Sequence, residues 1–285
     1  MTKRKTAILI AAPALLIVTV AVVVPMVVLG FQSLNAYGTS SLSIDGLGFD
    51  NYVRIITTPF YQTSIVRTLS LAAIVVIVVA PMGFILAVEF IRSRGARKAA
   101  LSLLILSPLL ISVIIRNLGW IIILGPQSVV ANVMTWLGVS GAVSGLLNTP
   151  AAIVIGLAHV MVPFMMLPIV AALENMDSNT VAAARTLGAS PMAVLRDIVI
   201  PAARPGLVAG GTLVFVLSAS YFITPALLGG ARIPMMSFLI YQAVSGSANF
   251  SFAAAASVVL LVMTTIVSYA VTSLNRSSVN DVKAR

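Results

Sequence analysis

The sequence contains no cysteine and very little charge. Cys is absent from all 285 residues, and Lys, Arg, Asp and Glu together make up only 8% of them. Without Cys there are no disulfide bridges and no thiolate metal sites. The shortage of charge accompanies a hydrophobic content of 60% and a mean hydropathy of +1.10. A water-soluble domain of this composition would expose a very large apolar surface, so the lipid bilayer is the expected solvent.

Acidic residues are the scarcer charged type. There are 7 Asp and Glu against 17 Lys and Arg, which gives a formal net charge of +10. Nucleic-acid-binding proteins carry an excess of basic residues on one folded face, whereas the basic residues here lie mainly in short gaps between apolar runs. The pattern therefore indicates membrane topology and no nucleic-acid partner.

Six apolar runs are long enough to cross a bilayer, which takes roughly 20 residues. The first run follows a basic segment, as in a signal peptide, but its length of about 25 residues exceeds the roughly 7–15 residues of a signal-peptide core. We therefore predict an uncleaved first span. The predicted fold is an all-α integral membrane protein, one domain over residues 1–285, with six transmembrane helices at about 7–31, 64–90, 99–124, 151–173, 205–228 and 252–274.

The basic residues predict the orientation of these spans. Thirteen of the 17 Lys and Arg residues lie in the gaps 1–6, 91–98, 174–204 and 275–285. Because positively charged loops remain in the cytoplasm, both termini are expected there. The loops at 32–63, 125–150 and 229–251 are then external, and the second of them is predicted to hold a short amphipathic helix from Ser128 to Leu137, anchored by Trp136.

Close helix contacts and kinks are also expected within the spans. Gly206 and Gly210 form a G-x-x-x-G pattern, which lets a neighbouring helix approach closely. Proline interrupts most spans and favours kinks that line cavities, although membrane helices also tolerate proline generally. The prolines are Pro13, Pro25, Pro81, Pro108, Pro163, Pro168 and Pro225.

The loop at 174–204 reads as helix, turn, helix. Asp177 or Ser178 is a suitable N-cap for the first helix, and Gly188 fits the position after its end, where φ becomes positive. Ser190 and Pro191 are typical N-cap and N1 residues of a second helix. Such a hairpin either connects two spans or protrudes to dock on a partner.

Alanines and one arginine distinguish the first of these helices. The small side chains of residues 182–184 allow the groove of a partner to close around the helix, and Arg185 can reach an acidic rim. Pro201 is expected to end the second helix just before the fifth span.

This loop resembles the EAA signature of the permease subunits of binding-protein-dependent ABC importers. That signature has E-A-A, then three residues, a glycine, nine residues and I-x-L-P. Ile200 replaces its leucine conservatively. Ala182 replaces its glutamate and so lacks a carboxylate that could pair with the ATPase, a loss for which the ATPase would have to compensate. The resemblance implies that the ATPase-coupling residues are Ala182, Ala183, Ala184, Arg185, Gly188, Ile198 and Pro201.

Nearly the whole chain resembles spermidine/putrescine-type permeases, on the stretches 49–52, 115–120 and 155–168. This resemblance implies a multi-pass protein of the bacterial inner membrane. Its expected partners are a second homologous permease, two cytoplasmic ATPases and an external substrate-binding protein. The sequence contains no Walker-type G-x-x-x-x-G-K-[ST], so we expect no enzyme activity and no bound cofactor here, with ATP and Mg²⁺ used by the ATPases.

Polar residues within the spans are candidates for the substrate pathway. A lone intramembrane His159 is also suited to bonding a neighbouring helix, and Arg116 either acts as a gate or substrate ligand, snorkels, or pairs with an external acid such as Asp50. The candidates are Arg116, Asn117, Trp120, His159, Ser220 and Tyr221.

The charge of Arg116 leaves the chemical class of the transported substrate undecided. Its charge repels a polyamine unless a carboxylate, supplied for example by the companion permease, neutralises it. The alternative cargo is an opine, an amino acid derivative or an organophosphonate. An ion-coupled secondary transporter is a remote alternative because the bilayer centre lacks carboxylates, and a membrane enzyme is disfavoured by one His and no Asp in any span.

Overall fold

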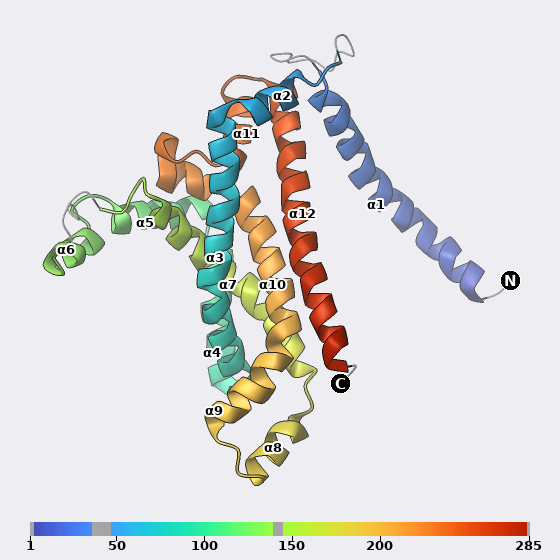
Figure 1. Cartoon of the computed structure of the whole chain (residues 1–285), viewed down its shortest axis with the longest axis vertical. Coiled ribbons are helices and arrows are strands. Elements are labelled where there is room, and N and C mark those ends of the chain that lie inside the picture. The colour runs from blue at the N-terminus through green and yellow to red at the C-terminus, as the bar shows by residue number, and fades with distance from the viewer. Residues whose placement is uncertain (1–2, 36–46, 139–144, 284–285) are drawn as a thin grey trace. The chain divides into compact units, whose positions relative to one another are not determined.

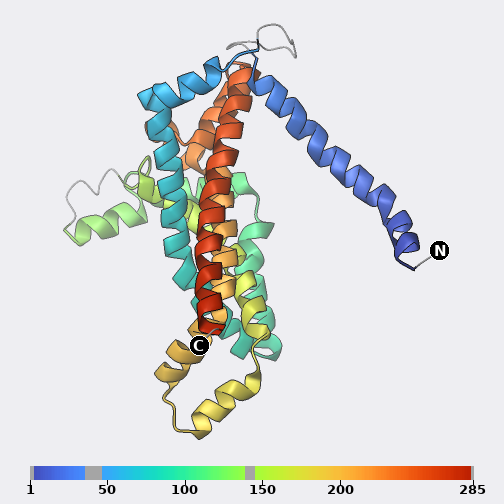
Figure 2. The ribbon, with the colours of Figure 1, turned by 45° about the vertical axis from the view of Figure 1, so that its right-hand side comes forward.

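A computed structural model describes residues 3–35, 47–138 and 145–283 (Figures 1 and 2). These ranges form helices and turns without any strand. The helices are α1 (Lys3–Ser33), α2 (Asp50–Thr57), α3 (Pro59–Arg92), α4 (Gly95–Leu110), α5 (Val113–Leu124), α6 (Val129–Trp136), α7 (Pro150–Glu174), α8 (Ser178–Thr186), α9 (Pro191–Val194), α10 (Ile200–Ser220), α11 (Met236–Ser245) and α12 (Phe250–Lys283). Two π-helical turns, Leu195–Val199 and Pro225–Gly229, and one 3₁₀ turn, Gly230–Arg232, complete the description.

Six helical segments of the described chain are long and apolar enough to cross a membrane, which confirms the predicted all-α fold with six spans. The third segment joins α5 and α6, and the fifth includes α9 and α10. The segments are Leu16–Ser33, Pro59–Arg92, Val113–Trp136, Pro150–Glu174, Pro191–Ser220 and Phe250–Ser273.

Contacts divide the chain into two compact units, so the single domain over residues 1–285 stays a prediction. The first unit comprises residues 1–62 and 239–262. Within it, the hydroxyls of Ser33 and Tyr52 share a hydrogen bond of 2.6 Å, and the rings of Tyr61 and Phe252 pack with centroids 5.0 Å apart. These contacts join the end of α1 to α2 and the start of α3 to the start of α12.

The second unit, residues 63–238 and 263–285, is built around α7. This helix is apolar on all sides and most of its residues are buried, as expected for a central helix. Met165 lies between two glycines: a carbon added at Gly83 would lie 2.6 Å from Met165 Cγ, and one added at Gly210 would lie 2.9 Å from the Met165 carbonyl oxygen. The glycines therefore let α3 and α10 approach α7 closely.

The predicted close contact at Gly206 and Gly210 is confirmed. A carbon added at Gly206 would lie 2.5 Å from the carbonyl oxygen of Pro168 on α7. Both glycines of the pattern are buried against α7. The G-x-x-x-G spacing therefore marks the contact between α7 and α10.

The third predicted span differs from the structure. Residues 99–124 were expected to form one helix, but the chain is extended at Ile111 (ψ 135°) and Ser112 (ψ 133°), so that α4 ends and α5 begins there. Pro108 lies in the last turn of α4, and the carbonyls of such a turn have no partner within the helix. Unbroken hydropathy across the bend explains why the sequence gives no sign of it.

The fifth span also has other bounds. The prediction that Pro201 ends a helix is wrong, because α9, the π turn and α10 follow one another without a break. Ile200 donates its N–H to the carbonyl of Leu195 across the wide π turn, and a proline just after such a turn is tolerated because the regular ladder is already interrupted. The helix then ends at Ser220 rather than Leu228, since Tyr221 is extended (ψ 124°).

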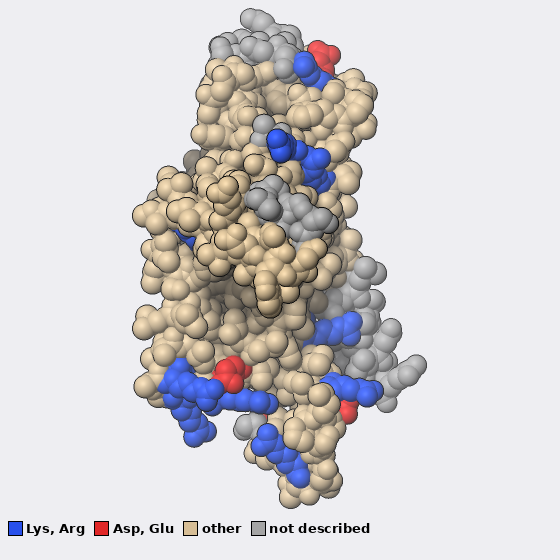
Figure 3. All heavy atoms as spheres, turned by 90° about the vertical axis from the view of Figure 1, so that its left-hand side faces the viewer, with Lys and Arg blue, Asp and Glu red and all other residues tan. Residues whose placement is uncertain are grey.

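Basic side chains gather at one end of the second unit. Figure 3 shows Lys and Arg concentrated at its lower end, where α3 ends, α4 begins and the α8–α9 hairpin lies (Figure 1). Arg97 forms a salt bridge of 2.6 Å with Glu89 there. The grouping is that expected of the water-exposed end of a membrane bundle.

Candidate functional site

The turn between α8 and α9 has the predicted local structure. Asp177 caps α8 by accepting a hydrogen bond of 2.9 Å from the N–H of Asn179. Gly188 follows the helix with φ of +84°, in the left-handed region that favours glycine. Ser190 caps α9 by accepting from the N–H of Ala193 at 3.2 Å. The predicted caps and turn are therefore confirmed as local structure, although the second predicted helix, α9, is the start of the fifth span rather than a separate helix before it.

The hairpin presents small side chains outward. Ala182, Ala183 and Arg185 are exposed, whereas Ala184 is half-buried and packs against the core. In the π turn, Ile198 also packs against this core, while Pro201 is exposed at the start of α10. The predicted coupling residues thus divide into an exposed face at α8 and a packed base at Ile198.

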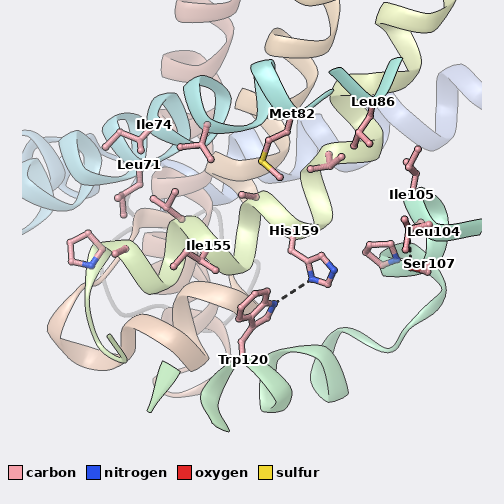
Figure 4. A pocket seen from close by; sticks show the side chains of 17 residues that line it. Leu71, Ile74, Met82, Leu86, Leu104, Ile105, Ser107, Trp120, Ile155 and His159 are labelled. Carbon is pink, nitrogen blue, oxygen red and sulfur yellow. Dashed lines mark hydrogen bonds between the residues drawn. The ribbon is translucent and has the colours of Figure 1, made fainter. Parts of the chain in front are cut away.

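A cavity of about 780 Å³ lies among α3, α4, α5 and α7 (Figure 4). Nearly all of its 17 lining residues are apolar, and the polar ones are Ser107, Trp120 and His159. The apolar wall includes Leu71, Ile74, Met82, Leu86, Leu104, Ile105 and Ile155. Sequence reasoning missed these residues, because apolar side chains occur throughout every span and nothing in their pattern distinguishes a wall from a core.

Trp120 and His159 meet across this cavity. The indole N–H of Trp120 donates to His159 Nδ1 at 3.3 Å, and the two rings are edge-on with centroids 5.6 Å apart (Figure 4). Since Nδ1 accepts, a neutral imidazole carries its proton on Nε2, which leaves one hydrogen-bond donor for a ligand. This pair is the principal polar feature of the cavity.

Arg116 joins two helix ends beside the same cavity. Its Nη1 donates to the carbonyl of Pro108 at 2.6 Å, which supplies the partner that the end of α4 lacks. Its Nη2 donates to the hydroxyl of Tyr221 at 3.1 Å, and Ser237 in turn donates to the Tyr221 carbonyl at 2.9 Å. The side chain is only 8% exposed, and both of its partners are uncharged.

The other two pathway candidates do not join these pairs. Asn117 is buried on α5 and donates to the carbonyl of Val113 at 2.7 Å. Ser220 is exposed at the last position of α10. The structure therefore brings together Arg116 with Tyr221 and Trp120 with His159. Among the described residues, no three His, Asp or Glu side chains group in a way that could hold a metal ion.

Known structures share this arrangement of helices. A bacterial ABC transporter that imports the acidic polysaccharide alginate has a chain that matches with a TM-score of 0.76 and 18% identity over 96% of each chain. A structure of a bacterial alginate ABC transporter with a pentasaccharide-bound periplasmic protein matches with a TM-score of 0.72 and 17% identity, again over 96% of each chain. The six-span helical fold is therefore one that chains of bacterial ABC transporters share.

Sequence similarity identifies the family. The chain belongs to the binding-protein-dependent transport system inner membrane components, a family that matches residues 81–279. It is 30% identical over 238 residues to the spermidine/putrescine transport system permease protein PotB of Salmonella typhimurium strain SL1344, which covers 81% of this chain and 83% of that protein. The chain is therefore a multi-pass permease subunit of the bacterial inner membrane and not an enzyme.

Proposed function

We propose that this permease forms half of the pathway by which an ATP-driven importer takes up a polyamine, such as spermidine or putrescine, or a related nitrogen compound. The identity of 30% to a spermidine/putrescine permease over most of both chains is the observation that carries the proposal. The cavity beside Trp120 supports it, since an aromatic face attracts an ammonium group.

The proposed assembly contains a second homologous permease, two cytoplasmic ATPases and an external binding protein. The match to the family of binding-protein-dependent components supports the last of these. This chain lacks a Walker motif, so ATP and Mg²⁺ would be held by the ATPases, and we assign no cofactor to the chain itself.

In this proposal the α8–α9 hairpin couples the ATPases to the pathway. The outward alanines at 182 and 183 leave room for a partner groove, and the cap at Asp177 and the turn at Gly188 fix the direction of α8. Ala184 of α8 and Ile198 of the π turn both pack on the core, so a displacement of α8 would be transmitted to α7 and α10. The basic end at which the hairpin lies is assigned to the cytoplasm together with both termini.

Uptake in cells tests both parts of this proposal. Cells lacking the chain receive either the wild type or Ala183→Trp, which adds bulk to the outward face of α8. Ala96→Trp, at an exposed alanine of the first turn of α4, is the matched control. We expect uptake of labelled spermidine with the wild type and Ala96→Trp only. Normal uptake with Ala183→Trp would refute the coupling role.

A zwitterionic or anionic substrate is the second candidate, and one observation favours it. Arg116 is buried beside the cavity with only uncharged partners, and a buried charge normally pairs with an opposite one. An opine, an amino acid derivative or an organophosphonate would supply that anion, as would a carboxylate of the companion permease. Excess unlabelled opine competing with spermidine uptake, or polyamine uptake that is unchanged by deletion, would move the assignment to this class.

A further inference from the structure

A second cavity lies at the base of the α8–α9 hairpin, separate from the proposed transport pathway. Its volume is about 420 Å³, and its lining consists of seven apolar residues and three arginines. The buried part of the wall is formed by Leu173, Val194 and Val199. Arg92, Arg94 and Arg185 form an exposed rim. The cavity is therefore apolar inside and positively charged at its edge.

The rim charges lack partners of opposite sign. None of the three rim arginines forms a salt bridge with a carboxylate of the described residues. Glu89, on the last turn of α3 before Arg92, pairs with Arg97, which does not line the cavity. Three guanidinium groups around one opening repel one another, so an anion bound among them would be stabilised by all three.

The position of the cavity indicates which class of anion it is suited to bind. Arg92 is the last residue of α3, whose apolar span ends there, so the rim lies at the boundary between hydrocarbon and water. Val181 and Arg185, four residues apart, place the same face of α8 on the cavity. The outward Ala182 and Ala183 do not line it.

We propose that this cavity binds an anionic phospholipid, with its phosphate among Arg92, Arg94 and Arg185 and the start of an acyl chain against the apolar wall. Basic pockets between membrane helices bind such headgroups. A soluble phosphate would gain nothing from the apolar wall, and an acidic segment of an ATPase would meet the rim but not the interior. The lipid would hold the hairpin base against α3 and α7.

Native mass spectrometry of the detergent-purified full chain tests this site. Dioleoyl phosphatidylglycerol and dioleoyl phosphatidylcholine are titrated in turn onto the wild type and onto Arg92→Gln with Arg94→Gln. We expect phosphatidylglycerol to bind more tightly than phosphatidylcholine. We expect the double variant to lose about thirty-fold in phosphatidylglycerol affinity, which corresponds to about 1 kcal/mol for each of two arginines.

Two further variants control for net charge and for folding. Arg97→Gln with Arg196→Gln removes two exposed charges outside the cavity and is expected to keep wild-type lipid binding. Arg92→Lys with Arg94→Lys keeps the charges and is expected to keep most of it. An equal loss in both glutamine pairs, or equal binding of the two lipids, would overturn the proposal.

Two competition arms separate the lipid from other anions. Displacement of phosphatidylglycerol by millimolar inorganic phosphate would show a site for soluble anions instead. If Arg92→Gln with Arg94→Gln kept lipid binding but lost co-purification with the ATPase, the rim would belong to that protein contact. The lipid proposal expects neither result.

Discussion

The Nη2 atom of Arg116 donates a hydrogen bond of 3.1 Å to the hydroxyl of Tyr221, although the two residues are 105 positions apart. Arg116 lies in the first turn of α5, just after one helix break, and Tyr221 is the first residue after α10. Two interruptions of the transmembrane helices thus meet at one buried side chain. Such breaks are tolerated at membrane depth only where other groups form hydrogen bonds with the freed backbone. Here the Pro108 carbonyl accepts from Arg116, and the Tyr221 carbonyl accepts from Ser237.

Removal of the Tyr221 hydroxyl tests this junction. Tyr221→Phe leaves Nη2 of the buried Arg116 without its acceptor, and we expect a loss of about 1–3 kcal/mol in stability. Thermal unfolding of the detergent-purified protein measures the effect. Tyr269→Phe, at a 75% exposed position on α12, is the control and should leave the midpoint unchanged. Equal midpoints for both variants would show that the bond contributes nothing.

The contact between α7 and α10 gives a second prediction. Gly206→Ala places a carbon 2.5 Å from the Pro168 carbonyl oxygen, so the helices must separate, at a cost of about 1–3 kcal/mol. Gly211→Ala on the same helix meets its nearest atom, Val76 Cγ1, at an ordinary 3.5 Å. It should be neutral or stabilising by up to about 1 kcal/mol, since alanine favours a helix. Thermal unfolding of both purified variants measures these effects. A midpoint for Gly206→Ala equal to that of the wild type would contradict the prediction.

Local chemistry made part of this structure predictable. The caps at Asp177 and Ser190, the positive φ at Gly188 and the short helix after Ser128 all follow from side chains within four residues. The bend at Ile111 did not follow, because Pro108 and its apolar neighbours are equally compatible with a continuous membrane helix.

Gly188 provides a third prediction, in which backbone conformation is separated from side-chain volume. A carbon added there meets nothing within 4 Å, so only the φ of +84° opposes substitution. Gly188→Val should strain the turn by about 1–2 kcal/mol and lower ATP-dependent uptake, whereas Gly188→Asn should be tolerated. Transport assays on both variants, at equal amounts of protein in the membrane, test this prediction. Equal uptake by Gly188→Val and Gly188→Asn would mean that the backbone conformation of this turn does not affect transport.

The pair formed by Trp120 and His159 gives a fourth prediction. Trp120→Phe keeps an aromatic ring but removes the N–H that orients the imidazole. If the pair lines the pathway, the KM for uptake should rise about 2- to 10-fold, the equivalent of one hydrogen bond, with little change in protein level. Trp136→Phe, at an 85% exposed position on α6, should change neither quantity. An unchanged KM in Trp120→Phe would remove the pair from the pathway.

The two side-chain pairs of the candidate site show where sequence reasoning ends. The sequence predicts each pathway residue from a property of its single position, a polar side chain in an apolar span. This holds for Arg116, Trp120, His159 and Tyr221. Their pairing depends on how α5 folds back from α4 and on where α10 ends, and both are set by packing around α7. No spacing along the chain encodes those distances.

Transport by the complete reconstituted complex distinguishes an ATP-driven importer from an ion-coupled carrier. Proteoliposomes hold the permeases and ATPases, with binding protein and labelled spermidine on one side and ATP on the other. For an ATP-driven importer we expect uptake that requires ATP, resists ionophores, and is abolished by Ala183→Trp but not by Ala96→Trp. Uptake that proceeds without ATP and collapses with an ion gradient would contradict it.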